Sequence, residues 1–256
     1  MTNSGCGEKI NYICVDDASS DNTVLYAKKW LSNNQKLFNN FNIIVNDKNL
    51  GIVGNWIKAI NQVKYGPFKI IAGDDLILFN NIFEVMNCNN ITFTPIMKFN
   101  QDYRCITSND LFWDECKNKN VDSIQKIVKR ELQYRCPIPA PGAFIPNSFL
   151  KNQEYQVFLK QFKYMEDYPT WYYWIIQRKA KISMIYKPYI AYREFSGISS
   201  DKPNNSFRKE FINEIEFVNN VCGVKTYMNK YSNPHTYINF IKRRLNNYWP
   251  FAISCG

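Results

Sequence analysis

Three pairs of neighbouring acidic residues are the side chains in this sequence best suited to chemistry. They are Asp16-Asp17, Asp74-Asp75 and Glu166-Asp167. Carboxylates can ligate a hard divalent cation, accept an N–H from a ligand or take up a proton. Acidic residues are also common in turns and in the first turn of helices, so each pair alone favours an ordinary loop or cap. The elements around each pair must decide between these interpretations.

The first two pairs follow short apolar segments that have the composition of buried strands. We predict strands at 10–15, 41–45, 68–72 and 91–97, and helices at about 21–32, 52–63 and 79–86. The helices are indicated by apolar residues at helical spacing, and Ser20 or Asp21 can cap the first of them. This alternation predicts a parallel, helix-covered sheet, in which ligands bind at the carboxyl ends of the strands.

The second half of the chain is less regular. The Pro-rich residues 137–146 cannot form a regular element, because proline lacks a backbone donor and restricts its neighbour. Apolar spacing predicts helices at about 124–132, 167–178, 207–218 and 238–245. Pro169 suits the first turn of the second of these helices. The third acidic pair, Glu166-Asp167, therefore lies where that helix begins.

Composition excludes several other kinds of site. A single histidine argues against a His-based metal site or a Ser-His-Asp triad, and the eight cysteines include no C-x-x-C pair of a zinc ribbon or thioredoxin motif. Among 256 residues there is no apolar run near the roughly 20 residues that span a bilayer, and no signal peptide is visible, so we expect a cytoplasmic protein. The net charge of +10 is scattered, which favours a solvated surface over a nucleic-acid-binding face.

Five segments, in order along the chain, resemble the family-2 glycosyltransferases of the GT-A fold. They are residues 15–23 (VDDASSDNT), 49–55 (NLGIVGN), 73–75 (GDD), 166–168 (EDY) and 192–199 (YREFSGIS). Each segment alone is a weak signal, whereas five in register over residues 10–199 make coincidence an unsatisfactory explanation. The resemblance implies a mostly parallel, mixed α/β sheet flanked by helices, with a helical C-terminal part.

The resemblance also assigns nucleotide-binding residues. Asp17, or alternatively Asp16, accepts the imide N–H of uracil, and Asn49 and Gly51 lie beside the nucleotide. Arg193 meets the diphosphate as a cation. Structural turns, and an ion pair of Arg193, are the competing interpretations.

The family's metal-binding motif matches Asp74, the expected main ligand, and Asp75, the second. Together with diphosphate oxygens they would hold Mg²⁺ or Mn²⁺, which stabilises the leaving diphosphate. The first aspartate of the common motif is Ala72 here, so fewer carboxylates are present. A solvated Asp-Asp turn is the alternative.

The family's catalytic base matches Asp167, with Glu166 as the neighbour that could replace it. Inverting transfer needs one carboxylate to take the proton of the acceptor hydroxyl. Gly142 matches a family segment that lines the acceptor cleft. The ordinary alternative for the acidic pair is a favourable interaction with a helix dipole.

The resemblance divides the chain into three parts. Residues 1–100 are the nucleotide-sugar-binding part of the GT-A domain, 101–200 its acceptor-binding and catalytic part, and 201–256 a helical extension. The family's first strand and helix have no counterpart before residue 10; that strand lies between the VDD and GDD strands. We expect a start codon further upstream, a decayed gene, or direct pairing of the two flanking strands.

The sequence thus predicts a metal-assisted, inverting glycosyltransferase that moves a sugar, by resemblance from a UDP-sugar, to a glycan or lipid-linked acceptor of a bacterial surface. Residues 237–251 mix aromatic with basic side chains and could bind an anionic membrane surface peripherally, or pack as an ordinary helix. One rival is a catalytically impaired remnant with a binding or structural role. The other is a basic nucleic-acid-binding module, which leaves the aspartate motifs unexplained, and we expect no nucleic-acid partner.

Overall fold

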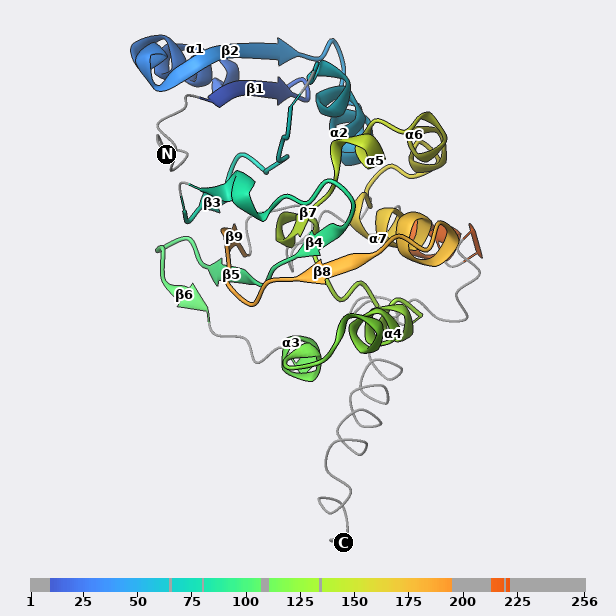
Figure 1. Cartoon of the computed structure of the whole chain (residues 1–256). Helices are drawn as coiled ribbons and strands as arrows, with labels where there is room; N and C mark the ends of the chain where they lie inside the picture. Colours follow the sequence, from blue (N-terminus) through green and yellow to red (C-terminus); the bar gives the residue numbers. More distant parts are fainter. Residues whose placement is uncertain are drawn as a thin grey trace, which may run out of the picture.

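The computed structural model of the chain describes residues 10–64, 66–79, 81–106, 111–133, 135–194, 213–218 and 220–221 (Figure 1). The strands are β1 (Ile10–Asp16), β2 (Phe38–Val45), β3 (Leu76–Ile77), β4 (Ile91–Phe93), β5 (Ile96–Phe99), β6 (Cys105–Ile106), β7 (Ala143–Phe144), β8 (Ile182–Met184) and β9 (Ile190–Arg193). The α-helices are α1 (Thr23–Asn33), α2 (Gly51–Gln62), α3 (Leu111–Cys116), α4 (Val121–Glu131), α5 (Asn147–Leu150), α6 (Gln153–Leu159) and α7 (Asp167–Trp171). Short 3-10 helices are η1 (Gln35–Leu37), η2 (Ile82–Val85) and η3 (Ala140–Gly142), and η4 (Tyr172–Gln177) is π-helical.

The strands form three small sheets. β1 and β2 form one, a second has the order β3-β9-β5-β6, and a third has the order β7-β4-β8. The pairs β1–β2, β4–β8 and β5–β9 are parallel, and β3–β9, β4–β7 and β5–β6 are antiparallel. The predicted α/β class is confirmed; the β1–β2 sheet is parallel and the other two sheets are mixed. None of the described helices combines the length and apolarity needed to cross a bilayer.

The amino-terminal unit follows the predicted order of strand, helix, strand and helix. β1 and β2 pair in parallel from Asn11 opposite Asn40 to Asp16 opposite Val45, so both strands end at the same edge. The predicted strands at 10–15 and 41–45 and the predicted helices at 21–32 and 52–63 are confirmed, with small shifts of their ends. The unit therefore places the end of β1 beside the start of α2.

The strand predicted at 68–72 is wrong, because these residues have no regular structure. Their side chains still alternate: Phe68 and Ile70 pack against the main core, whereas Lys69 lies over Phe144 in a smaller cluster that Ile71 also contacts. An extended segment becomes a strand only when a neighbour supplies its ladder of hydrogen bonds.

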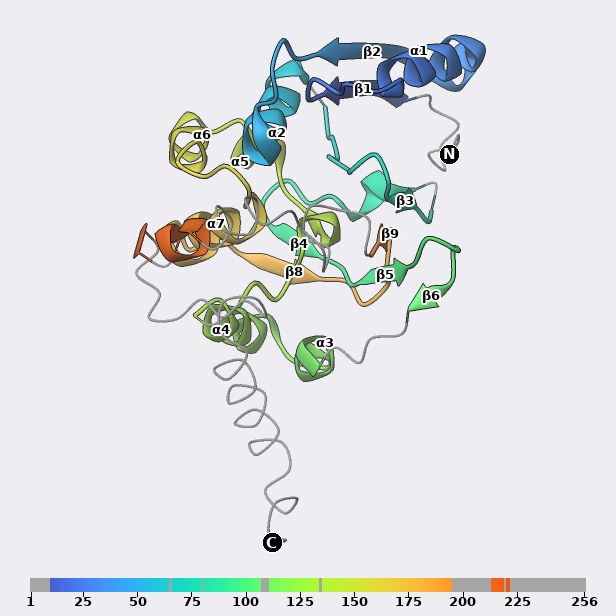
Figure 2. The ribbon, with the colours of Figure 1, turned by 180° about the vertical axis from the view of Figure 1, so that it is seen from behind.

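No such neighbour exists in the described part of the chain. β1 pairs with β2 alone and lies apart from the other sheets in both ribbon views (Figures 1 and 2). Direct pairing of β1 with residues 68–72, one of the three expectations for the absent first strand, is therefore wrong. The described residues leave an interrupted sheet at this place.

The main hydrophobic core packs around β4 and β8. Phe93 of β4 and Trp171 of α7 meet edge to face with ring centroids 5.1 Å apart, and both are fully buried. Ile60 of α2 and Val128 of α4 belong to the same cluster. Burial of one such side chain contributes about 1.5–3 kcal/mol. The core thereby fixes α7, at whose start Glu166-Asp167 lies, and α2 beside the end of β1.

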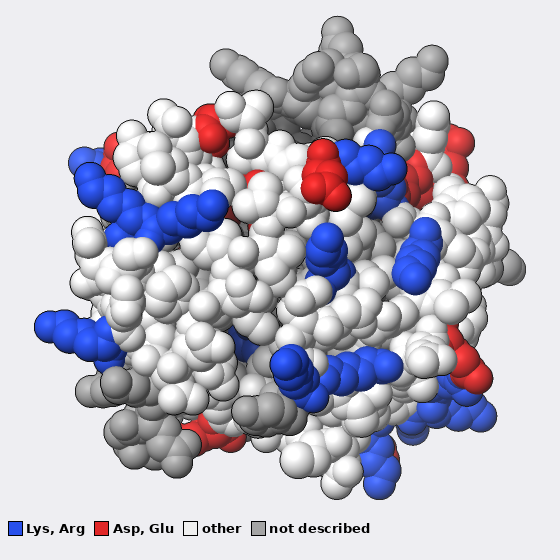
Figure 3. Space-filling model, turned by 90° about the horizontal axis from the view of Figure 1, so that it is seen from above, with Lys and Arg blue, Asp and Glu red and all other residues white. Residues whose placement is uncertain are grey.

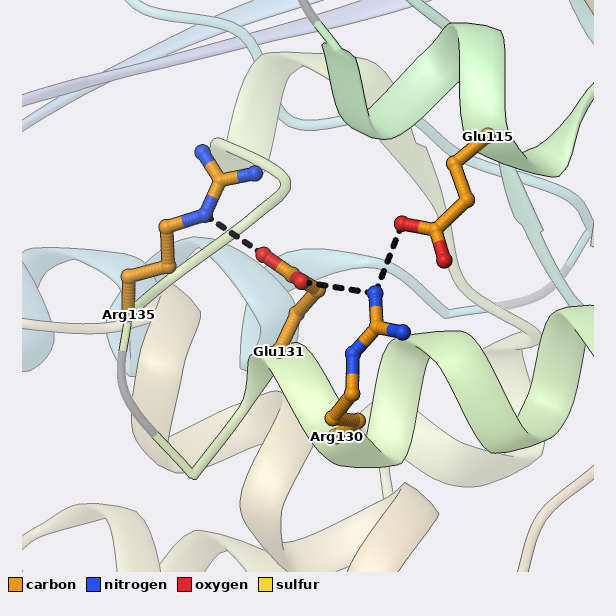
Figure 4. A network of polar contacts seen from close by, with 4 residues as sticks. All are labelled: Glu115, Arg130, Glu131 and Arg135. Atoms are coloured by element: carbon orange, nitrogen blue, oxygen red, sulfur yellow. Dashed lines mark hydrogen bonds and ion pairs between the residues drawn. The ribbon is translucent and has the colours of Figure 1, made fainter. Parts of the chain in front are cut away.

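The helix predicted at 124–132 is confirmed as α4. Its first turn is capped by Asn120, whose side chain accepts the backbone N–H of Ser123. At its end, buried Glu131 accepts hydrogen bonds from Arg130 and Arg135, and Arg130 also reaches Glu115 of α3 (Figure 4). This network joins α3 to α4.

The remaining predictions for the second half are partly confirmed. The helix predicted at 167–178 is α7 followed by η4, with Pro169 in the first turn. Residues 137–146 are mostly irregular and include only η3 and the two-residue β7. Residues 213–218 are helical, as expected for the helix at 207–218. The earlier part of that helix and the whole of 237–251 lie outside the described residues.

Lys and Arg are spread over the face that carries the amino-terminal unit rather than gathered in one block (Figure 3). This distribution agrees with a solvated surface on that face.

Candidate active site

Asp17 joins the end of β1 to the first turn of α2. Its Oδ1 accepts the N–H of Leu50 at 2.7 Å and an amide hydrogen of Asn46 at 2.9 Å, and its Oδ2 accepts the N–H of Gly51 at 2.9 Å. Gly51 has φ +77°, a left-handed conformation that glycine adopts without penalty. A carboxylate has about four acceptor positions, so one is left for a ligand donor.

Asp16 and Asn49 shape the two turns beside Asp17. Asp16 is buried and accepts both the N–H and the hydroxyl of Ser19, at 2.9 and 2.6 Å. Exposed Asn49 donates to the carbonyl of Asp17 and accepts the N–H of Gly51. The structure thus brings together all four nucleotide-binding candidates of this region. Asp16 is buried and holds a turn, whereas Asp17 is half-buried, which makes Asp17 the more accessible carboxylate.

Asp74 and Asp75 occupy a turn that faces Arg193 at the end of β9. Asp75 is 5% exposed and its Oδ1 accepts the N–H of Arg193 at 3.2 Å, while its Oδ2 is buried without a hydrogen-bond partner. The guanidinium of Arg193 donates to the carbonyl of Asp74, whose side chain lies in solvent. Burial, reinforced by the charge of Asp74, raises the pKa of Asp75 to about 6.

Arg193 lies beside two aromatic rings that stack on each other. Its guanidinium lies 5.2 Å from the ring centroids of both Phe99 and Tyr103, and it donates to the Tyr103 hydroxyl. Tyr103 is exposed at the β5–β6 turn. The cation is therefore fixed beside the Asp74-Asp75 turn and remains next to solvent.

These residues fit a divalent cation that is shared with a ligand. In the part of the chain that the structure describes, no group of three or more His, Cys, Asp or Glu could hold a metal alone. The unpartnered oxygen of Asp75 is a buried acceptor that costs about 1–3 kcal/mol unless something pairs with it. A cation whose remaining ligands are phosphate and water oxygens meets that need, with Asp74 beside it.

The acidic pair Glu166-Asp167 lies at the start of α7. Asp167 Oδ1 accepts the N–H of Tyr168 at 2.6 Å, and its Oδ2 accepts the thiol of Cys136 at 3.4 Å. Burial raises the pKa of both carboxyl groups, and the charge of Asp167 raises that of Glu166 further. A carboxylate with a raised pKa is a better proton acceptor near neutral pH.

The loop of residues 163–165 connects this pair with the start of α2. The carbonyl of Lys163 accepts the N–H of Val53, and a methyl group on Gly51 would lie 3.2 Å from Lys163. Glu214 accepts the backbone N–H groups of all three loop residues. The nucleotide candidates and the base candidate are therefore joined through one loop.

Gly142 permits a close approach in η3. A methyl group there would lie 2.5 Å from the carbonyl of Thr94, whose N–H donates to the Gly142 carbonyl. Half-buried Lys69 donates to the carbonyls of Ala140 and Ala143 on either side. Burial lowers the pKa of Lys69 to about 7, against the charge of Asp75. Packing explains this glycine, and its contact with an acceptor stays a prediction.

Three polar residues of the site were not identified by sequence reasoning: Lys69, Cys136 and Glu214. Lys69 was not recognised because it lies in an apolar segment predicted as a strand, and Cys136 because it borders the Pro-rich residues 137–146. Glu214 meets partners 49 to 51 positions earlier in the chain, which no local pattern indicates.

The mixed α/β fold is of the GT-A type, with aspartates after β1 and beside β9. Residues 3–86 match the sequence family described as Glycosyl transferase family 2. Over these residues the chain is therefore similar to that family, whose members are enzymes with nucleotide-sugar donors and acceptor substrates. The matched residues include the aspartates of the first two pairs and end before Glu166-Asp167.

One similar solved structure is the glycosyltransferase TarS of S. aureus, residues 1–349, with a TM-score of 0.50 and 15% sequence identity. The match covers 94% of this chain and 62% of the TarS chain, so the chain spans less than two thirds of that structure. At this identity the likeness shows the fold. No curated protein matches the chain by sequence.

Proposed function

We propose that the protein transfers a sugar from a nucleotide-sugar, with UDP as the expected nucleotide, to a hydroxyl group of a glycan or glycolipid with inversion. The observation that carries this proposal is the 163–165 loop, which joins the first turn of α2 to the acidic pair Glu166-Asp167. A donor bound at the first turn of α2 and a base in the Glu166-Asp167 pair would therefore lie on neighbouring elements. Synthesis of a bacterial surface polysaccharide is the setting that the family resemblance suggests.

In this proposal the donor binds across the ends of β1 and the β3–β9 region. The remaining acceptor position of Asp17 takes the imide N–H of uracil, and Asn49 and Gly51 line the nucleotide. Arg193 pairs with the diphosphate, which its fixed position beside the Phe99 and Tyr103 rings favours. The C-terminal residues 237–251 could add peripheral membrane binding.

Asp74 and Asp75 are the residues that would hold Mg²⁺ or Mn²⁺. When bound, the cation supplies charge stabilisation to the leaving diphosphate. Carboxylates bind such a cation in the ionised form. Because the pKa of Asp75 is raised to about 6, its contribution grows as the pH rises through that value.

Asp167 acts as the base in the transfer. It takes the proton of the acceptor hydroxyl while that oxygen forms a bond to the anomeric carbon and the bond to the diphosphate oxygen breaks on the opposite face. Glu166 is the alternative proton acceptor. The acceptor would bind near Gly142, in the loop that Lys69 holds.

Turnover of a panel of nucleotide-sugars with Mn²⁺ tests this proposal. Asp167→Asn should lower turnover by about 10²- to 10⁴-fold and leave UDP binding intact. Asp122→Asn, in the first turn of α4, is the matched control and should behave as wild type. Wild-type turnover in Asp167→Asn would refute the assignment of the base, and no turnover of any donor would refute the activity.

One observation favours a second candidate, a remnant that binds nucleotide without catalysis. β1 and β2 pair only with each other among the described strands, so the donor side rests on a two-stranded sheet. Such a protein would bind UDP and turn over no donor with any acceptor.

A further inference from the structure

Glu214 is an acidic residue far along the chain from the three acidic pairs. It lies in the helical segment 213–218 and is 9% exposed. A buried carboxylate is costly unless hydrogen bonds or charges compensate it. Its partners are therefore informative.

Glu214 binds three consecutive backbone amides. Its Oε1 accepts the N–H groups of Lys163, Tyr164 and Met165 at 3.1, 2.8 and 2.9 Å, and its Oε2 is 3.0 Å from the N–H of Tyr164. Hydrogen bonds from backbone N–H groups to a charged acceptor are about twice as strong as neutral ones. The carboxylate thus fixes the backbone of the 163–165 loop.

The segment that carries Glu214 is itself anchored. Ile215 and Val218 belong to the main core, and the ring of Phe217 lies 5.6 Å from that of Phe162. This segment lies beside α7 in both ribbon views (Figures 1 and 2). The position of Glu214 is therefore set by the core rather than by the loop.

The loop has the acidic pair at one end and α2 on its other side. Glu166 follows Met165 directly, and the carbonyl of Lys163 accepts the N–H of Val53 in the first turn of α2. A loop held by its amides on Glu214 and by a carbonyl on α2 has little freedom to displace the pair.

We propose that Glu214 is a positioning residue for transfer: it holds the 163–165 loop so that Glu166-Asp167 keeps a fixed distance from the start of α2. This inference rests on the proposed role of Asp167 as base. It adds a requirement for a residue from the carboxyl-terminal part of the chain, outside the residues that match the family.

The test compares Glu214→Gln and Glu214→Ala with Glu216→Gln, an exposed glutamate two positions along the same segment. The full chain is used with a donor that the wild type turns over. Misplacement of a reacting group by about 1 Å can cost about a hundredfold in rate. We expect kcat to fall at least about tenfold in Glu214→Ala, less in Glu214→Gln, and to change little in Glu216→Gln, with donor KM changing less than kcat.

The pH profile supplies a readout that lost packing alone would not move. Glu166 is faced by Asp167, Glu214 and the hydroxyl of Tyr155, and Asp167 by the thiol of Cys136. The charge of Glu214 raises the pKa of Glu166, so Glu214→Gln should shift the titration of the Glu166-Asp167 pair, and with it the acid limb of kcat, to lower pH. Glu216→Gln should leave it in place.

Wild-type kcat and an unshifted acid limb in Glu214→Gln would overturn the inference, even if its melting temperature fell. If Glu214→Ala does not fold, the isosteric Glu214→Gln still decides. A wild type that turns over no donor would instead refute the proposed function, and the inference with it. The two failures are thereby distinguishable.

Discussion

Burial opposes charge at two of the three acidic pairs, Asp74-Asp75 and Glu166-Asp167. Asp75 has one carboxylate oxygen without a partner, and Glu166 and Asp167 lie side by side, each with a raised pKa. Unpaired or repelling carboxylates reduce stability, so their presence together at strand and helix ends is typical of functional sites. These buried carboxyl groups are therefore the residues whose protonation should control the activity.

The adjacent carboxyl groups predict an unusual pH dependence. Their raised pKa values mean that the base is still protonated above the ordinary carboxyl pKa of about 4, so activity should rise with pH through a higher range. Because the charge of Asp167 raises the pKa of Glu166, Glu166→Gln removes the carboxyl of the pair that loses its proton last and should move the acid limb of kcat/KM to lower pH. An acid limb at about pH 4 in the wild type, or an upward shift in the variant, would contradict this assignment.

At the scale of elements, local sequence patterns predicted correctly those helices and strands that do not depend on a missing neighbouring strand. The apolar spacing of α2 and α4 and the position of Pro169 were sufficient, because each helix forms its own hydrogen bonds. The segment 68–72 failed for the opposite reason: a strand needs a partner, and β1 pairs only with β2 in the described residues. The position of Glu214 was equally out of reach, because its three partners are distant in the sequence.

The α3–α4 network offers a stability test away from the site. Glu131 is 3% exposed and accepts hydrogen bonds from two arginines. Glu131→Gln places a buried neutral amide, whose NH₂ group is a donor, next to these two cationic donors. We expect the free energy of unfolding to fall by about 1–3 kcal/mol in urea denaturation. Glu115→Gln, whose partner Arg130 is half exposed, should cost less than about 1 kcal/mol. Equal denaturation midpoints for Glu131→Gln and the wild type would contradict the role of the network.

At the scale of the whole molecule, the described residues divide unevenly in packing. The core around β4 and β8 holds α2, α4, α6 and α7. By contrast, α1 beside the β1–β2 sheet leaves the side chains of Leu25, Tyr26 and Trp30 exposed. A two-stranded sheet is only marginally stable by itself. The donor side of the site therefore rests on the less supported part of the described chain.

Hydrogen exchange measures this difference directly. Amides of β1 should exchange at least about tenfold faster than those of β4, because local opening follows the number of buried contacts. The slow amides of β4 provide the internal reference in the same sample. Equal protection of β1 and β4 would show that the two parts unfold as one unit.

Calorimetric titration of UDP, with and without Mn²⁺, tests the central claim of a nucleotide-sugar site at Asp74-Asp75. We predict binding that requires the metal, is lost in Asp75→Asn and Asp74→Ala, and persists in Asp114→Asn on exposed α3 surface. Binding should also weaken as the pH falls below about 6, because protonated Asp75 no longer ligates a cation. Absence of UDP binding, or a UDP affinity that is the same without Mn²⁺ and in both site variants, would contradict the account.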